Sequence, residues 1–195
     1  GYAPEPIPLP FSGKPVLALG AHLKHTFCLT DGQQAFLSPH LGELNSLNQY
    51  QHFEDILNFY LEQHAIKPEL LACDLHPDFY SSRLAEEFAL KHNIPLIKVA
   101  HHQAHIASVL VEVNLPENSR FIGLALDGIG LGETSKQPLW GGELFYGELI
   151  QSASRSELSL NHRAQLASLC LPGGDQATQE IGRIAFALLE QLPID

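Results

Sequence analysis

Several things are missing from the sequence, and each absence excludes a class of protein. The chain has no methionine and begins at Gly1, which indicates a piece of a longer polypeptide. Its 11 lysines and arginines face 22 acidic residues, the net charge is -11, and no basic stripe is present, so we expect no nucleic-acid partner. No apolar run is long enough to span a membrane, and no signal-peptide pattern starts the chain. We therefore expect no membrane association and a cytoplasmic location.

Cysteine is also scarce. Cys28, Cys73 and Cys170 lie far apart and form no Cys-x-x-Cys pair, which argues against a disulfide framework and against zinc-finger spacing. We interpret all three as structural residues of a reduced protein. Apolar residues are abundant: the chain is 45% hydrophobic and only 17% charged, which argues against intrinsic disorder. Its 195 residues can form one domain or two small ones.

The first part of the chain has the pattern of one α/β lobe. Residues 1–10 hold four of the 13 prolines, which predicts an extended linker or an edge-packing tail. Three short strands follow, with Asp31-Gly32 as a hairpin turn between the second and third. An amphipathic helix comes next, and then strands alternate with helices, which implies parallel pairing. The expected strands are 16–20, 26–30, 34–38, 70–75 and 94–99, and the expected helices are 46–64, 81–92 and 103–113.

This order predicts an actin-like or ribonuclease-H-like α/β fold, in which a mixed sheet is flanked by helices. The pattern restarts with a strand at 121–126, a glycine-rich turn at 127–138 and a strand-like segment at 139–150. Residues 155–170 carry no clear pattern, and a helix is expected at 176–192 with Asp175 as its N-cap. We divide the chain into a tail (1–14), a first lobe (15–118) and the start of a truncated second lobe (119–195).

A histidine-dense turn, Val99-Ala-His-His-Gln-Ala-His105, lies at the junction of a strand and a helix. The i, i+4 spacing of His101 and His105 places both on one helix face, where neutral imidazoles can bind zinc, iron, nickel or copper. They emerge from the carboxyl end of a strand, where ligands bind in open α/β sheets. His76 and Asp78 end a neighbouring strand, and we expect them to support the metal ligands, with Asp78 preferred as a helix cap.

Two glycine-containing segments could also take part in chemistry. Asp127-Gly-Ile-Gly130 follows an apolar strand, and its backbone could wrap a phosphate while the carboxylate holds a metal ion. A plain Asp-Gly hairpin turn explains the same spacing equally well. Trp140-Gly-Gly-Glu143 could line a ligand site, although tryptophan packing over glycines is preferred. The other histidines of interest are expected to be surface or packing residues: His40, His52, His64, His92 and His162. The sequence identifies no catalytic residue and no Ser-His-Asp or Cys-His arrangement.

Eight segments, taken together and in order, resemble one known family. They are Gly1-Tyr-Ala-Pro, Leu19-Gly-Ala-His-Leu-Lys-His-Thr-Phe-Cys, Phe36-Leu-Ser-Pro-His-Leu-Gly-Glu, Asp74-Leu-His-Pro-Asp, His101-His-Gln-Ala-His, Leu126-Asp-Gly-Ile-Gly, Trp140-Gly-Gly-Glu and Leu171-Pro-Gly-Gly-Asp. The family is that of the HypF hydrogenase-maturation carbamoyltransferases. Its members carry an acylphosphatase-like domain, zinc-finger-like modules, a YrdC-like domain and an actin-like domain related to tRNA threonylcarbamoyl transferases. The chain resembles the first part of that last domain.

The resemblance implies a reaction. Carbamoyl phosphate and ATP give a carbamoyl-adenylate, and the actin-like domain passes its carbamoyl group to the carboxy-terminal cysteine of HypE, where it becomes a cyanide ligand of the [NiFe] centre. His101 and His105 match the family's metal-binding histidines for zinc or iron, and Asp127 matches an acid at the metal and phosphate site. Nucleotide or phosphate binding is assigned by the same resemblance to Asp127, Gly128, Gly130, Gly174 and Asp175.

The resemblance also implies that some residues of the family's site are not part of this chain. The family's further metal-binding aspartate and its adenosine-binding glycines lie beyond Asp195, so we expect this chain to be inactive without the remainder of the HypF chain, including the YrdC-like domain. Two other functions remain as alternatives. One is an O-carbamoyltransferase or a threonylcarbamoyl-transferase relative, and the other is a non-catalytic ATP-binding or docking module.

Overall fold

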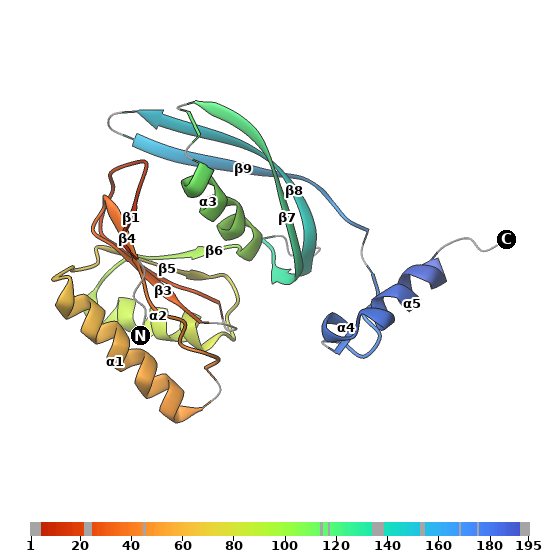
Figure 1. Ribbon diagram of the computed structural model, residues 1–195, viewed down its shortest axis with the longest axis horizontal. Helices are drawn as coiled ribbons and strands as arrows, with labels where there is room; N and C mark the ends of the chain where they lie inside the picture. The colour runs from red at the N-terminus through yellow and green to blue at the C-terminus, as the bar shows by residue number, and fades with distance from the viewer. Residues whose placement is uncertain are drawn as a thin grey trace.

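The computed structural model describes residues 5–21, 25–44, 46–113, 115–116, 118–133, 139–152, 155–167, 169–174 and 176–191, and these ranges contain two β-sheets (Figure 1). The first sheet has six strands in the order β1-β4-β3-β2-β5-β6. Their bounds are Ile7–Pro8 for β1, Val16–Leu19 for β2, Phe27–Thr30 for β3, Gln34–Leu37 for β4, Leu70–Asp74 for β5 and Leu96–Val99 for β6.

The pairing in this sheet confirms the predicted mixed topology. β2, β3 and β4 form an antiparallel meander, whereas β5 pairs in parallel with β2 and with β6. The turn between β3 and β4 is closed by Asp31, whose Oδ1 accepts the backbone N–H groups of Gln33 and Gln34 at 2.8 Å each. Gly32 in this turn has φ of 96°, a conformation that favours glycine. At the outer edge the proline-rich tail adds β1 to β4, as expected of an edge-packing segment.

Two helices cover one face of the first sheet. α1 (Leu47–Gln63) and α2 (Tyr80–His92) both pack on the core that contains Leu17, Leu29 and Leu71. α1 begins at the N-cap Ser46, whose side chain accepts the N–H of Gln49. The N-cap of α2 is Phe79, so the expectation that Asp78 caps this helix is wrong.

The opposite face of the same sheet carries small side chains. In β2, Leu17 and Leu19 are buried in the helix-covered core, and Ala18 between them points to the other side, because side chains alternate along a strand. Ala18, Cys28 and Ala72 line a cavity there. Burial raises the pKa of the Cys28 thiol to about 11, which fits the expected structural role of this cysteine.

α3 (His101–Val113) connects the first sheet to the second. It begins two residues before the predicted start, so His101 is already helical. The second sheet is an antiparallel meander of β7 (Ser119–Leu131), β8 (Leu139–Ser152) and β9 (Arg155–Gln165). Ile106 of α3 packs with Ala125 and Phe145 in a second core between α3 and this sheet. β9 lies where the sequence carried no clear pattern.

The predicted glycine-rich turn at 127–138 is wrong for its first residues, because β7 continues through Asp127 to Leu131. Gly128 and Gly130 are not among the described glycines that have a positive φ. The glycines of this segment are therefore strand residues, and at Gly130 the missing side chain permits close approach to α3.

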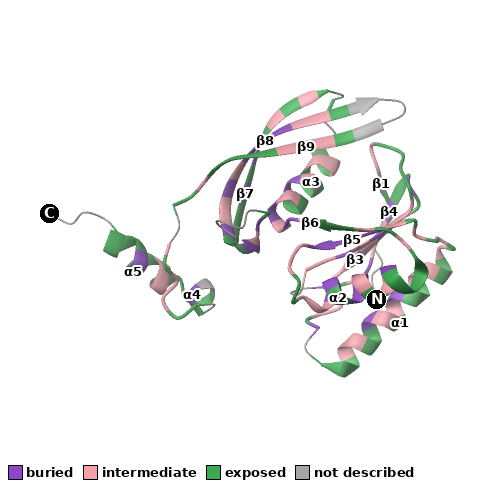
Figure 2. Cartoon of the chain, turned by 180° about the vertical axis from the view of Figure 1, so that it is seen from behind, coloured by how far each residue is buried: buried purple, intermediate pink, exposed green. Residues whose placement is uncertain are grey.

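The chain ends in two helices where one was predicted. α4 (Gln176–Gln179) and α5 (Ile181–Gln191) are separated at Glu180, and the predicted N-cap Asp175 lies outside the described residues. Both figures show this segment standing apart from the two sheets, and Figure 2 shows that α5 is mostly exposed. Within the described part of the chain, no helix combines the length and the hydropathy needed to cross a membrane. The six-stranded mixed sheet with its helices, followed by a three-stranded sheet, confirms the predicted α/β fold class.

Candidate metal site

The parallel pairing of β5 and β6 brings an acid and a histidine together. Asp74 is the last residue of β5 and pairs in register with Val99, the last residue of β6. His101 follows two residues later as the first residue of α3, and its Nδ1 lies 2.8 Å from Oδ2 of Asp74. An ionised carboxylate can only accept a hydrogen bond, so Nδ1 of His101 carries a proton, and Nε2 offers a lone pair to a cation once its own proton is lost.

Three potential ligand atoms converge on the exposed side of His101. Its Nε2 lies 2.9 Å from Oδ2 of Asp127 and 3.3 Å from Nε2 of His105, and the third separation, from His105 Nε2 to Asp127 Oδ2, is 3.4 Å. Ligands about 2.0–2.1 Å from a tetrahedral zinc ion lie about 3.3–3.4 Å from one another. Two imidazole nitrogens and a carboxylate oxygen therefore fit three positions around one divalent cation.

Asp127 reaches this cluster through an irregularity in β7. The register of β7 against β8 shifts between Leu126, which pairs with Gly142, and Gly130, which pairs with Trp140. Asp127 to Ile129 thus lie opposite Gly141 alone, which is a β-bulge. In a regular strand, residues 127 and 130 would point to opposite faces. The bulge changes this alternation, so Asp127 contacts the histidines while Gly130 also packs on α3.

The electrostatics of the cluster favour cation binding. The hydrogen bond to Asp74 raises the pKa of His101 above its usual range, because the carboxylate stabilises the imidazolium. The same carboxylate makes the Nε2 lone pair a stronger metal ligand. For Asp127, partial burial opposes ionisation, but the Gly128 N–H and the nearby histidines outweigh it and lower the pKa. Asp127 is therefore ionised at neutral pH and ready to bind a cation.

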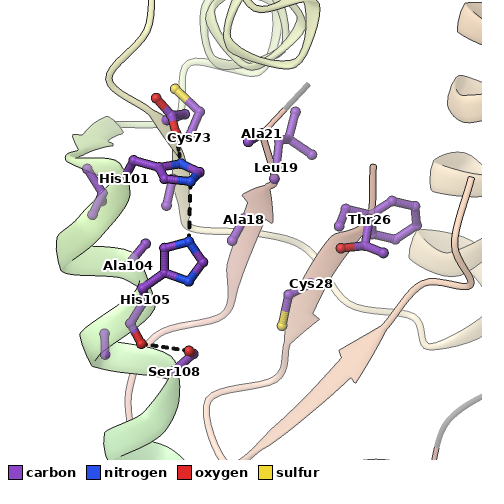
Figure 3. Close-up of a pocket in the computed structure, with 16 residues that line it drawn as sticks. Ala18, Leu19, Ala21, Thr26, Cys28, Cys73, His101, Ala104, His105 and Ser108 are labelled. Atoms are coloured by element: carbon purple, nitrogen blue, oxygen red, sulfur yellow. Dashed lines mark hydrogen bonds and ion pairs between the residues drawn. The ribbon is translucent and has the colours of Figure 1, made fainter. Parts of the chain in front are cut away.

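A cavity of about 560 Å³ opens beside the cluster. Figure 3 shows the rings of His101 and His105 one above the other on α3, both pointing into this space across from Ala18 and Ala21. Much of the lining consists of small residues from the sheet and from α3: Ala18, Gly20, Ala72, Ala104, Ala107 and Ser108. The cavity can therefore hold a ligand whose polar end reaches the histidines.

The other predicted site residues have different positions. The N–H of Gly128 donates to Oδ1 of its neighbour Asp127 at 2.7 Å, and Gly130 packs against His102. Gly174 precedes α4, in the segment that stands apart from α3 in Figures 1 and 2, so the structure does not bring it to the histidines. Asp175 lies outside the described residues. Phosphate binding by these four residues stays a prediction.

His76 and Asp78 differ in their relation to the cluster. The backbone N–H of His76 donates to Oδ1 of Asp74 at 2.8 Å, and the His76 ring stacks on Phe79. Asp78 is exposed, pairs with Arg83 at 3.5 Å, and makes none of the described contacts with His101, His105 or Asp127. The residue that supports His101 directly is Asp74, which sequence reasoning missed although it ends the strand next to the histidine strand.

His102 is a second residue that the sequence did not single out. Its side chain is fully buried, and its Nε2 lies 2.9 Å from the carbonyl oxygen of Gly141 in β8. Because a carbonyl only accepts, Nε2 carries the proton. Burial lowers the pKa of His102, which keeps this imidazole neutral. His102 therefore ties the first turn of α3 to the second sheet.

Comparison with known proteins places these features in a family. Residues 11–112 match the model of the HypF Kae1-like domain, and residues 123–195 match that of the carbamoyltransferase Kae1-like domain, second subdomain. Carbamoyltransferase HypF2 of Cupriavidus necator is 42% identical over 192 residues, which cover 98% of this chain and 22% of the relative.

Two solved structures are similar over nearly the whole chain. Full-length HypF in the phosphate- and nucleotide-bound form has a TM-score of 0.78 and 33% identity, with 96% of this chain and 23% of that chain covered. HypF of T. kodakarensis has a TM-score of 0.78 and 31% identity, with 98% and 24% covered. The chain thus spans less than a quarter of the length of these relatives.

Proposed function

The chain belongs to the family of the HypF Kae1-like domain, and on this premise we propose that it forms the carbamoyl-transferring part of an ATP-dependent carbamoyltransferase. The observation that carries the proposal is the convergence of His101, His105 and Asp127, of which the two histidines also line a cavity of about 560 Å³. Relatives that are 38–42% identical over 97–98% of this chain are carbamoyltransferases by name, and a relative was solved with phosphate and nucleotide bound.

The proposed substrates and partners follow from the family. Carbamoyl phosphate and ATP are converted to a carbamoyl-adenylate by the remainder of the protein, including a YrdC-like domain. This chain then presents the adenylate to the thiol of the carboxy-terminal cysteine of HypE. The thiocarboxamide product serves the synthesis of a cyanide ligand for the [NiFe] centre of a hydrogenase.

The chain's own residues hold the reacting groups in this proposal. His101, His105 and Asp127 hold a zinc or iron ion, which supplies positive charge against the phosphate of the adenylate. Asp74 fixes the ring orientation and the proton position of His101. The small side chains of the cavity leave room for the carbamoyl group beside the two histidines. We also propose that the lobe boundary lies near residue 118, between α3 and β7.

A transfer assay in the full-length protein tests this function. The protein is incubated with carbamoyl phosphate, ATP and HypE, and the mass of the HypE carboxy-terminal peptide is measured before and after metal removal by a chelator. We expect the carbamoyl adduct with the intact protein, its loss after metal removal, and its return on adding zinc or iron. Transfer that persists in metal-free protein contradicts the metal role. Nucleotide binding without any transfer supports a non-catalytic docking module instead.

Asp74→Asn tests the support of His101. Asp74 accepts two hydrogen bonds, from His101 Nδ1 and from the N–H of His76, and asparagine offers only one oxygen for these two donors. Loss of such an outer contact costs about 10–100-fold in metal affinity. We expect a loss of that size in a competition titration of Zn²⁺ against a chelating dye. Asp78→Asn is the matched control, since Asp78 is exposed and follows the same strand. Equal affinities in the two variants argue against the assignment of Asp74.

A further inference from the structure

A buried carboxylate lies in β8, away from the three candidate ligands. Glu143 is 2% exposed, yet both of its oxygens have partners: Oε1 accepts the backbone N–H of Gly141 at 2.8 Å, and Oε2 accepts from Nε2 of His162 at 2.6 Å. Burial of a carboxylate costs several kcal/mol unless hydrogen bonds compensate it. A residue that is costly to bury and is fully hydrogen-bonded is therefore expected to hold something in place.

Glu143 holds the backbone of Gly141, which contacts both elements that carry candidate ligands. The carbonyl of Gly141 accepts from Nε2 of His102, the residue next to His101 on α3. A Cβ on Gly141 would lie 3.4 Å from the carbonyl oxygen of Gly128 and 3.6 Å from that of Asp127, so Gly141 lies against the bulge. Displacement of the Gly141 backbone would disturb the positions of His101 and Asp127 together.

The packing around these groups leaves little room for compensating shifts. Gly130 meets His102 so closely that a Cβ there would lie 2.6 Å from Cε1 of His102 and 2.9 Å from Cβ of His101. On the other side, Trp140 is 3% exposed and stacks on His162, with ring centroids 4.7 Å apart and planes inclined by 16°. His162 is thus held against Trp140 while it donates to Glu143. In a close-packed region of this kind, small shifts are transmitted rather than absorbed.

We propose that Glu143, together with His162, is a positioning residue for the candidate metal site. The pair holds the N–H side of Gly141, and the backbone of this residue fixes His102 through its carbonyl and packs against the bulge of Asp127. The inference rests on the proposed function, because it requires that His101, His105 and Asp127 bind a cation. Glu143 contacts none of these three side chains in the described structure, so its effect on the site is indirect.

Cobalt binding to the full 195-residue chain tests the proposal, because the visible spectrum of Co²⁺ reports the geometry of its ligands. Glu143→Leu keeps a similar shape and removes both acceptors, and we expect Co²⁺ affinity to fall by about 10-fold or more with a changed spectrum. Glu143→Gln should largely restore both, since its oxygen can accept from Gly141 and its NH₂ can donate to His162 in the other tautomer. Rescue by glutamine separates positioning from a general loss of packing.

A second acid on β8 supplies the control. Glu148→Leu removes an ion pair with Arg120 near the far end of the strand, and we expect it to leave Co²⁺ affinity and spectrum unchanged. His101→Ala removes a ligand, so the Co²⁺ spectrum that it loses is the part that comes from the metal cluster. If wild-type chain binds Co²⁺, His101→Ala does not, and Glu143→Leu has wild-type affinity and spectrum, the positioning role is overturned while the metal site stands. If the wild-type chain binds no Co²⁺, both the metal site and the positioning role of Glu143 are ruled out.

Glu143→Leu could be too unstable to fold, and His162→Phe then decides the question. Phenylalanine keeps a ring against Trp140 but removes the hydrogen bond to Glu143. We expect weaker Co²⁺ binding and an altered spectrum in a chain whose thermal unfolding remains cooperative. Wild-type affinity and spectrum in a folded His162→Phe chain overturn the proposal.

Discussion

His101→Ala is expected to abolish cation binding by the cluster and, in the full-length protein, carbamoyl transfer with it. The substitution removes one of three ligand atoms and leaves Asp74, whose side chain is only 7% exposed, without its imidazole partner. Structural zinc sites bind with about 10–16 kcal/mol, so the loss of one of a few ligands costs roughly 3 kcal/mol or more, which is at least about 100-fold in affinity. We expect this to be the largest functional effect of any single substitution discussed.

The measurement is a Zn²⁺ competition titration of the chain, followed by the transfer assay in the full-length protein. His105→Ala should behave similarly in the titration, because it also removes one ligand nitrogen. His52→Ala is the matched control, since His52 is an exposed histidine of α1. Unchanged zinc affinity in both His101→Ala and His105→Ala would rule out the proposed site, whatever the transfer assay shows.

Gly130→Ala is expected to damage both stability and the metal site. The added Cβ would lie 2.6 Å from Cε1 of His102 and 2.9 Å from Cβ of His101, closer than real Cβ atoms approach their neighbours. Neither histidine can yield freely, because His102 is bonded to Gly141 and His101 to Asp74. β7 must therefore move away from α3 and carry Asp127 with it. Overpacking of this kind costs about 1–3 kcal/mol of unfolding free energy.

Urea unfolding and the zinc titration check this expectation. Gly128→Ala provides the control, because a Cβ at Gly128 meets nothing within 4 Å and Gly128 is not among the described glycines with a positive φ. We expect Gly128→Ala to be close to neutral and Gly130→Ala to lower both the unfolding free energy and the zinc affinity. A Gly130→Ala chain as stable as wild type would mean that β7 and α3 are less tightly packed than the distances indicate.

The first lobe could be predicted from the sequence because its signals are local. The apolar period of α1, the Asp31-Gly32 turn and the alternation of strands and helices each lie within a short stretch, and the structure confirms them. The second lobe was harder to predict. β9 carries many polar residues without regular alternation, and the glycines after Leu126 resemble a turn although they continue β7. Glycine indicates that the backbone needs space, but it does not indicate whether a turn or a neighbouring helix requires it.

The residues of the candidate metal site also divide into those that the sequence predicts and those that it does not. His101 and His105 could be paired from the sequence because one helical turn joins them, and the structure places their Nε2 atoms 3.3 Å apart. The local pattern at Asp127 fitted a metal-holding carboxylate and a plain hairpin turn equally well, and only the family resemblance joined it to the two histidines. The sequence favoured Asp78 as a helix cap and named it with His76 as a support for the ligands, whereas in the structure Asp74 is the acid at the end of β5 that contacts His101.

By itself, the sequence determined the strands and helices of the first sheet, the histidine pair and the net negative charge, because period, spacing and composition can be read without knowledge of distant contacts. Only the tertiary structure decided that Asp74, 27 residues before His101, orients that histidine, and that a bulge turns Asp127 towards it. It also decided that the buried Glu143 accepts hydrogen bonds from His162 and from the backbone of Gly141. These contacts join residues that are distant in sequence and carry no shared periodicity. They follow from strand register and from the packing of α3 on β7.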